Sequence, residues 1–137
     1  MPTLDPYLDA ARTRRRLVED WRRHGSLVVA YDFDNTVYDY HGAGDAYPAV
    51  VALLHRLRRL GCTLTVFTAN PDLAAVRAYL DREGIPFDAV NENPPFYPAT
   101  AGKIYYNALL DDRAGLRQVY DDLTWLCETV AQPPIEN

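Results

Sequence analysis

The sequence contains few residues of the kinds that bind zinc or form disulfide frameworks. It has two cysteines and three histidines among 137 residues, and Cys62 and Cys127 belong to no C-x-x-C or Cys/His array. A zinc site and a disulfide framework are therefore not expected. Unpaired cysteines are among the most buried residue types, so both thiols are predicted to lie in the core.

Long apolar runs are also missing. No run approaches the roughly 18 residues that a membrane-spanning helix needs. Residues 1–16, MPTLDPYLDAARTRRR, lack the apolar segment of a signal peptide. The sequence therefore predicts a soluble, cytoplasmic protein with no membrane association.

Positive charge is scarce, and nearly all of it is arginine. The 19 acidic side chains outnumber the 14 basic ones, which gives a net charge of -5 and argues against nonspecific binding of nucleic acid by the whole surface. The first predicted helix is nevertheless locally basic. It is either a solvated helix face, the simpler interpretation, or a docking surface for a nucleic-acid backbone. Its arginines are Arg12, Arg14, Arg15, Arg16, Arg22 and Arg23.

The rest of the pattern is that of one domain in which helices and strands alternate. A hydrophobic content of 48% over 137 residues can supply a core. Apolar residues at helical spacing, often between a proline and a glycine, mark the helices, and short β-branched or apolar runs mark the strands. The predicted helices cover 4–24, 47–61, 70–84 and 114–131. The predicted strands cover 26–33, 62–69, 85–92 and 103–112.

This order predicts an α/β fold, a single three-layer α/β/α Rossmann-like domain over residues 1–137. Its sheet is expected to be mostly parallel, with helices on both faces. Residues 1–24 form a basic amphipathic helix, 26–131 the core and 132–137 a frayed tail. In such folds ligands bind beyond the carboxyl ends of the strands.

Polar residues follow each predicted strand at that end. Asp32 and Asp34 come at the end of the first strand and share one face of it, because side chains alternate along a strand. Crowded carboxylates are relieved by protonation or by a bound metal, and oxygen ligands favour Mg²⁺. The polar residues at the other strand ends are Thr68, Asn70, Asn91, Asn93, Asp111 and Asp112.

One basic residue stands apart from the arginines. Lys103 is the only lysine in the chain and precedes the fourth predicted strand. Its flexible stem can carry a compact ammonium group into an acidic pocket. From composition alone, a surface lysine kept by chance is an equal alternative.

In chain order, these features resemble the four motifs of the haloacid dehalogenase (HAD) superfamily. The motifs are DFDNT at 32–36, a strand that ends in TVFTA with Thr68, the downstream Lys103, and LLDD with Asp111 and Asp112. The ordered set spans residues 26–112, and the stretch GIPFDAVNENPP…KIYYNALLDDRAG is similar to small capless members of the superfamily. The resemblance implies a Mg²⁺-dependent phosphatase.

The resemblance also implies a role for each catalytic residue. Asp32 is expected to attack phosphorus and form an aspartyl-phosphate. Asp34 is expected to protonate the leaving oxygen and later to activate water. Thr68 is expected to donate a hydrogen bond to a phosphoryl oxygen, and Lys103 to screen its charge.

The same resemblance implies the magnesium ligands. They are Asp32, the backbone carbonyl of Asp34, and an acid of the fourth strand. Asp112 is the expected direct ligand with Asp111 supporting it, although the reverse order stays open. Asn35 stands where the superfamily commonly has glycine, and asparagine tolerates a left-handed backbone better than most residues.

The gaps between the motifs are too short for a separate cap domain, so the site is expected to be open unless another subunit closes it. Its walls are predicted from 38–48 and 91–102, which mix aromatic and polar groups suited to a base or sugar face. Tyr38, Tyr40, Phe96 and Tyr97 can equally serve to pack these loops. The residues expected at the substrate are Asn35, Thr36, Tyr38, His41, Ala69, Asn70, Asn91 and Asn93.

Three functions remain open from the sequence. The favoured one is hydrolysis of a nucleotide, a sugar phosphate or a similar small phosphate ester. The second keeps this chemistry and assigns a macromolecular substrate, either a nucleic-acid end or a phosphoprotein. The third is a binding module with a silent site, although all the motif residues are present. A response-regulator receiver is excluded by the order in which its acidic residues occur.

Overall fold

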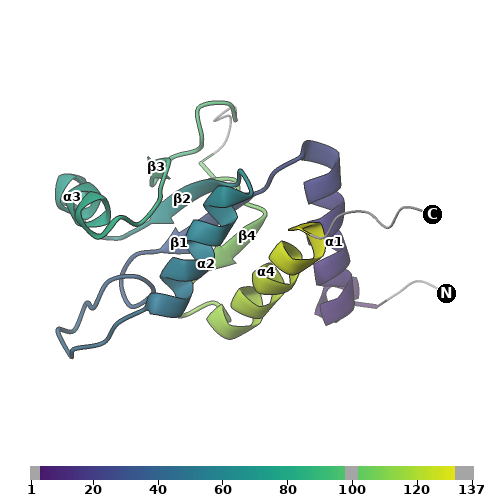
Figure 1. Ribbon diagram of the computed structural model, residues 1–137, viewed down its shortest axis with the longest axis horizontal. Helices are drawn as coiled ribbons and strands as arrows, with labels where there is room; N and C mark the ends of the chain where they lie inside the picture. The colour runs from purple at the N-terminus through teal and green to yellow at the C-terminus, as the bar shows by residue number, and fades with distance from the viewer. Residues whose placement is uncertain (1–3, 98–101, 132–137) are drawn as a thin grey trace.

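The structure, a computed structural model, describes residues 4–97 and 102–131. The predicted tail at 132–137 lies outside these ranges, as do residues 98–101 of a predicted pocket wall. Figure 1 shows the arrangement of the elements. The helices are η1 (Pro6–Leu8), α1 (Ala10–His24), α2 (Pro48–Arg59), α3 (Leu73–Glu83) and α4 (Leu116–Ala131). The strands are β1 (Val28–Asp32), β2 (Thr63–Phe67), β3 (Ala89–Val90) and β4 (Ala108–Leu110).

The four strands form one parallel sheet in the order β3-β2-β1-β4. The predicted α/β class and parallel sheet are confirmed. Strand β1 lies in the interior of the sheet, as its unbroken apolar run predicted, and Asp32 is its last residue. Because all strands run the same way, their carboxyl ends meet at one edge of the sheet.

Several predicted boundaries were wrong; the first α-helix, for example, begins at Ala10 and not at residue 4. Two of the differences have local reasons. Helix α3 is capped by Asp72, whose carboxylate accepts a hydrogen bond from the Ala75 N–H at 3.0 Å, rather than by Asn70. Strand β4 begins at Ala108, not at residue 103. The Tyr105 N–H before it donates to the side chain of Asn93 at 2.7 Å, and not to a neighbouring strand.

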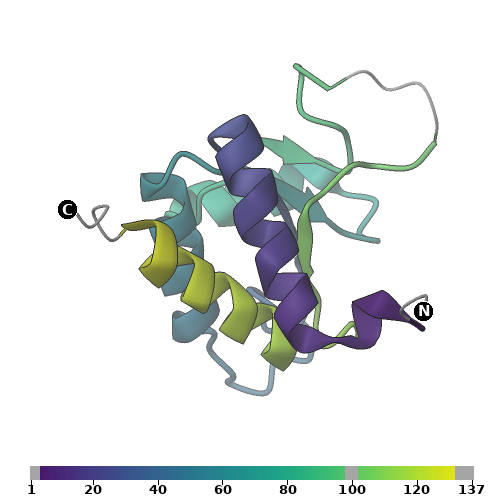
Figure 2. The ribbon, with the colours of Figure 1, turned by 90° about the vertical axis from the view of Figure 1, so that its right-hand side faces the viewer.

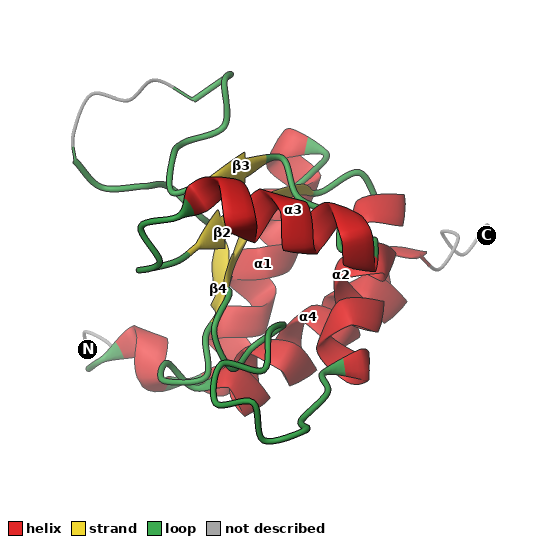
Figure 3. Ribbon diagram, turned by 90° about the vertical axis from the view of Figure 1, so that its left-hand side faces the viewer, coloured by secondary structure: helices red, strands yellow, loops and turns green. Residues whose placement is uncertain are grey.

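One face of the sheet carries the main hydrophobic core. Alternate strand residues, among them Val29, Tyr31 and Leu64, form one buried cluster with residues of all four α-helices. Helices α2, α3 and α4 lie on this side of the sheet, and α1 packs along α4 (Figures 1 and 3). Cys62 and Cys127 are buried in the same cluster, as predicted, and burial raises the pKa of the Cys62 thiol to about 11.

The opposite face has a different cover from the one predicted. Val28, Ala30 and Ala89 alternate onto this face and are buried, but they lie outside the main cluster. The described parts of the connection from β3 to β4 run beside this face (Figure 2). The Tyr106 ring of this connection meets the Phe67 ring edge-on, with centroids 5.8 Å apart. Within the described ranges, a loop with aromatic side chains therefore stands where a second helical layer was expected.

Among the residues that the structure describes, no helix is both long enough and apolar enough to cross a membrane.

Candidate active site

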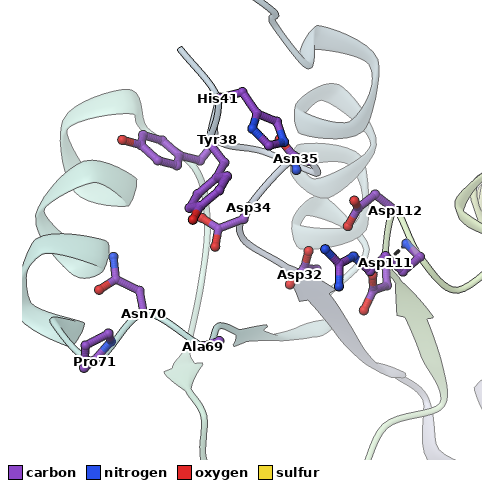
Figure 4. Close-up of a pocket in the computed structure, with 12 residues that line it drawn as sticks. Asp32, Asp34, Asn35, Tyr38, His41, Ala69, Asn70, Pro71, Asp111 and Asp112 are labelled. Carbon is purple, nitrogen blue, oxygen red and sulfur yellow. Dashed lines mark hydrogen bonds between the residues drawn. The ribbon is translucent and has the colours of Figure 1, made fainter. Parts of the chain in front are cut away.

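A pocket of about 740 Å³ opens at the carboxyl end of β1 (Figure 4). The loops that follow β1, β2 and β4 form its walls. Nine of the site residues predicted from the sequence line it, together with Tyr40, Pro71 and Arg113. The lining residues are Asp32, Asp34, Asn35, Tyr38, Tyr40, His41, Ala69, Asn70, Pro71, Asp111, Asp112 and Arg113.

Three carboxylates meet at this edge of the sheet. The parallel register aligns Tyr31 of β1 with Leu110 of β4. The residue after each of them is an aspartate: Asp32 follows Tyr31, and Asp111 follows Leu110. Asp32, Asp111 and Asp112 each offer an oxygen atom, and these oxygens all lie within 4.8 Å of one another. The sheet register thus creates the cluster that the two sequence motifs predicted.

The cluster disfavours full ionisation. Burial, a hydrogen bond with Asp112 and the charges of Asp111, Asp112 and Asp34 raise the pKa of Asp32 to about 7. Burial and the charge of Asp112 also raise the pKa of Asp34. Without a cation, Asp32 therefore keeps its proton in a substantial fraction of the molecules at neutral pH, where an exposed aspartate would be ionised.

The donor set fits a magnesium ion. Its three converging groups are all carboxylates, the hard oxygen ligands that Mg²⁺ prefers, and no cysteine or histidine belongs to the cluster. A divalent cation would also remove the like-charge repulsion that raises the pKa of Asp32. The Asp34 side chain lies outside the three-carboxylate group, on the other side of Asp32 in Figure 4.

A tight turn after β1 directs Asp34 and Asn35 into the pocket. The Val37 and Tyr38 N–H groups both donate to the carbonyl of Phe33, at 3.1 and 3.0 Å. Asn35 donates its N–H to the Tyr38 carbonyl at 2.8 Å and adopts a left-handed backbone with φ of 60°. The turn thus uses the conformational tolerance of asparagine that the sequence indicated.

Thr36 does not line the pocket, contrary to its predicted substrate contact. Its side chain is fully buried, and its hydroxyl oxygen accepts a hydrogen bond from the Asp112 N–H at 3.2 Å. This bond joins the loop after β1 to the loop after β4. Thr36 is therefore a positioning residue, which sets the place of Asp112 relative to Asp32. No local sequence signal distinguishes this role from a role in substrate binding.

Asn91 and Asn93 also lie outside the pocket lining. The Asn91 amide bonds both backbone groups of Thr68, accepting from its N–H at 2.9 Å and donating to its carbonyl at 2.8 Å. Asn93 accepts from the Tyr105 N–H at 2.7 Å. Both predicted substrate contacts are thus replaced by hydrogen bonds that hold the backbone of neighbouring loops.

Thr68 lies at the end of β2 but is not among the residues that line the pocket. Its hydroxyl oxygen accepts a hydrogen bond from the Asn70 N–H at 3.0 Å. That bond shapes the turn that presents Ala69 and Asn70 to the pocket. The hydroxyl proton stays available for donation, although the structure does not place it against the carboxylates.

The cation that lines the pocket is an arginine, not the expected lysine. Lys103 is exposed and does not line the pocket, because β4 starts five residues further along the chain. Arg113 does line it, and its backbone N–H donates to the Asp111 carboxylate at 2.9 Å. The sequence signal for Arg113 was its position immediately after the two aspartates at a strand end.

The aromatic residues predicted to form the pocket walls lie at two different places in the structure. The Tyr38 ring stacks on Phe33 and meets the Tyr79 ring edge-on, with centroids 4.9 Å away in both cases, so it packs its loop as well as facing the pocket. Tyr40 is 61% exposed and lies edge-on to His41 at the rim. The other predicted wall is not part of this pocket, since Phe96 and Tyr97 line a separate hollow at the amino end of β1 and β2.

Comparisons with known proteins support the fold alone. No protein-family model matches the chain, and a search of curated proteins finds no match. A solved structure of a conserved protein from Bacteroides thetaiotaomicron is similar, with a TM-score of 0.59 and 22% sequence identity. The similarity covers 77% of this chain and 90% of that one. At this identity it bears out the α/β architecture and assigns no activity.

The pKa of Asp32 predicts how pH affects stability. It is raised from 3.8 to about 7 in the metal-free protein. Between these values the folded protein keeps a proton that the unfolded chain has lost, so stability falls as pH rises through this window. A bound Mg²⁺ replaces that proton. We therefore expect Mg²⁺ to raise the melting temperature more at about pH 8 than at about pH 5, measured by calorimetry against EDTA.

The matched control for this measurement is Asp32→Asn, which removes the titrating carboxyl group and keeps its shape. At the higher pH the metal-free variant should be more stable than the metal-free wild type, because one repelling charge is gone. Its gain from Mg²⁺ should be much smaller. An equal gain from Mg²⁺ at both pH values in the wild type would contradict this electrostatic account of the cluster.

Thr36 supplies a second prediction. Thr36→Val keeps the side-chain shape but leaves the Asp112 N–H without its acceptor. We expect the variant to bind Mg²⁺ roughly tenfold more weakly, by isothermal titration calorimetry, as for other residues that orient metal ligands. Thr36→Ser, which keeps the hydroxyl, should bind Mg²⁺ like the wild type. Unchanged affinity in a folded Thr36→Val protein would show that the bond does not position Asp112.

Proposed function

We propose that the protein is a Mg²⁺-dependent phosphomonoesterase of the HAD type. The observation that carries the proposal is the meeting of Asp32, Asp111 and Asp112 within 4.8 Å at a strand end, with Asp34 in the same pocket but outside that group. The arrangement offers a metal site, a nucleophile and a separate proton carrier. Each of the three acts in phosphoryl transfer through a carboxylate nucleophile.

The first step forms a bond between an Asp32 carboxylate oxygen and phosphorus, while the bond from phosphorus to the leaving oxygen breaks. Asp32, Asp111 and Asp112 would hold the Mg²⁺, which supplies positive charge that lowers the repulsion between carboxylate and phosphate. The Asp32 carboxylate must be deprotonated to attack. Because burial, the hydrogen bond with Asp112 and the neighbouring acids raise its pKa to about 7 in the metal-free protein, binding of a cation would favour the reactive form.

Asp34 is assigned the proton transfers. Its pKa is raised by burial and by the Asp112 charge, so more of it is protonated near neutral pH than of an exposed aspartate. A protonated Asp34 gives its proton to the leaving oxygen. It then takes a proton from water as that water attacks the phosphorus of the aspartyl-phosphate, which releases phosphate and restores the Asp32 carboxylate.

Arg113 is the pocket's candidate for binding the substrate phosphoryl group, in place of Lys103. It is the only arginine or lysine among the lining residues that the structure describes, and it forms no ion pair among them. A guanidinium group can donate two parallel hydrogen bonds to phosphate oxygens. The bond from its backbone N–H to the Asp111 carboxylate keeps the Arg113 backbone next to the acidic cluster.

The pocket walls suggest the class of substrate. A volume of about 740 Å³, with Tyr40 and His41 at the rim, can accommodate a nucleotide or a sugar phosphate. Asn35 and Asn70 provide amide groups for hydroxyl or base contacts. Small phosphate esters are therefore the favoured substrates of the isolated pocket.

The test is phosphate release with and without Mg²⁺ over nucleotides, sugar phosphates, phosphopeptides and phosphorylated oligonucleotides. Asp32→Asn should lower kcat by at least roughly three orders of magnitude, because an amide cannot act as the nucleophile. Asp34→Asn should lower it roughly 10²- to 10⁴-fold and allow the phosphorylated protein to accumulate.

Mass spectrometry of the quenched Asp34→Asn reaction identifies the phosphorylated residue. The proposal requires it to be Asp32. Phosphate on another residue, or turnover by Asp32→Asn at the wild-type rate, would contradict the mechanism. Circular dichroism of each variant separates a lost reaction from a lost fold.

Arg113 and Lys103 form a matched pair for a further prediction, since each is an exposed basic residue before or after the same strand. Arg113→Ala should lower kcat/KM by roughly 10- to 100-fold, the effect of losing a hydrogen-bonded charge at the phosphoryl group. Lys103→Ala should change it less than about twofold. The reverse result would restore the lysine to the role that the sequence predicted.

A further inference from the structure

A second hollow lies on the surface of α1. It has a volume of about 260 Å³ and is lined by Tyr7, Arg12, Arg15, Arg16 and Glu19, a set that we call the α1 arginine site. Three of these five residues are arginines and one is a glutamate, in a protein whose net charge is -5. The local excess of positive charge suits an anionic ligand.

The donors of this site are largely free of protein partners. The Arg12 Nε atom is buried without any hydrogen-bond partner in the described part of the chain, an uncommon state for a charged donor. The only carboxylate contact of Arg15 in that part is a long one, 3.9 Å to Asp9. The Arg16 guanidinium lies over the Tyr7 ring, 5.5 Å from its centroid. In the described residues, the Arg15 and Arg16 guanidinium groups thus keep donors for an acceptor-rich ligand.

A neighbouring arginine shows what a structural role looks like on the same helix. Arg14 donates to the buried Asp122 carboxylate of α4 at 2.8 Å and lies over the Trp125 ring. This contact anchors α1 to α4. The arginines of the α1 arginine site take no part in that ion pair.

The α1 arginine site and the carboxylate pocket both lie on the lower side of the molecule in Figure 1. Three residues separate the end of α1 from the start of β1. In Figure 1, η1 and the start of α1 lie at the lower right, and the loops that follow β1 and β4 lie further left at a similar height. A flexible phosphate-bearing chain could extend along this end of the molecule from one site to the other.

We propose that the α1 arginine site binds the phosphodiester backbone of a single-stranded nucleic acid whose phosphorylated end enters the carboxylate pocket. Guanidinium groups match phosphate oxygens in pairs, and the Tyr7 ring, 63% exposed, offers a surface for a base. Binding by the site is independent of any chemistry. Hydrolysis of the strand end rests on the function proposed above.

The binding test uses the Asp32→Asn protein, so that no turnover intervenes. The probe is a fluorescein-labelled, end-phosphorylated oligonucleotide of about ten nucleotides, followed by fluorescence anisotropy at about 50 mM salt. Adding Arg12→Ala and Arg16→Ala together should weaken binding roughly tenfold and flatten its salt dependence. Adding Arg59→Ala and Arg82→Ala, two exposed arginines on α2 and α3, should weaken it less than about twofold and serves as the charge-matched control.

Arg12→Lys guards against misfolding of the alanine variant, since it keeps the charge and loses the paired donors. It should bind the oligonucleotide more weakly than the parent protein and unfold at a similar temperature. The cluster variant is the one with Arg12→Ala and Arg16→Ala. Equal losses of affinity in the cluster variant and the control variant would overturn the proposal, because they would show only general electrostatic attraction. The proposal would also be overturned, in favour of a protein ligand, if the arginine substitutions weakened binding of a phosphopeptide but not of the oligonucleotide.

Measurements of turnover distinguish failure of the strand-binding proposal from failure of the proposed function. With active protein, the cluster variant should raise KM for the oligonucleotide roughly tenfold and leave KM for a mononucleotide unchanged. Hydrolysis of both substrates, with no effect of the cluster variant on KM for the oligonucleotide, would overturn the strand-binding site and leave the phosphatase intact. If no ester is hydrolysed, the anisotropy measurement still decides the binding site while the phosphatase fails.

Discussion

The repulsion among three carboxylates at the end of β1 is the constraint around which the site is built. The β1–β4 register brings Asp32 and Asp111 side by side, and Asp112 completes a group whose oxygens lie within 4.8 Å. Such an arrangement is unfavourable while all three are ionised, and burial together with the neighbouring acids raises the pKa of Asp32. A fold that keeps it must hold the two loops in place by other bonds, and must offer a cation or a proton to relieve the charge.

Those other bonds come from polar side chains that resemble binding residues in the sequence. Thr36 accepts from the Asp112 backbone, Asn91 bonds both backbone groups of Thr68, and Asn93 accepts from the Tyr105 backbone. Loop backbone at the edge of a sheet has unpaired N–H and C=O groups that must find partners. Hydroxyl and amide side chains near a site therefore often hold its loops rather than its ligand, and the pocket itself is left mainly to carboxylates, Asn35, Asn70 and Arg113.

Arginines serve different purposes within short distances in this chain. Arg14 is tied to a buried carboxylate and an indole ring, Arg12 has a buried nitrogen atom without a partner, and Arg113 lines the acidic pocket without an ion pair in the described ranges. An argument from composition counts these arginines alike, whether they lie on a helix or in a loop. What separates them is the partner that the fold brings to each guanidinium group, and an unpartnered guanidinium group retains its capacity for phosphate.

The sequence by itself determined the parallel α/β sheet, the burial of Cys62 and Cys127, and the approach of Asp32 to the Asp111–Asp112 pair. These features follow from local periodicity and from the rule that parallel strands end together. Only the tertiary structure decided that Thr36 bonds Asp112, that Arg113 rather than Lys103 lines the pocket, and that a loop covers the second face of the sheet. These outcomes depend on which distant backbone groups need partners and where β4 begins, and neither is encoded in the spacing of residues along the chain.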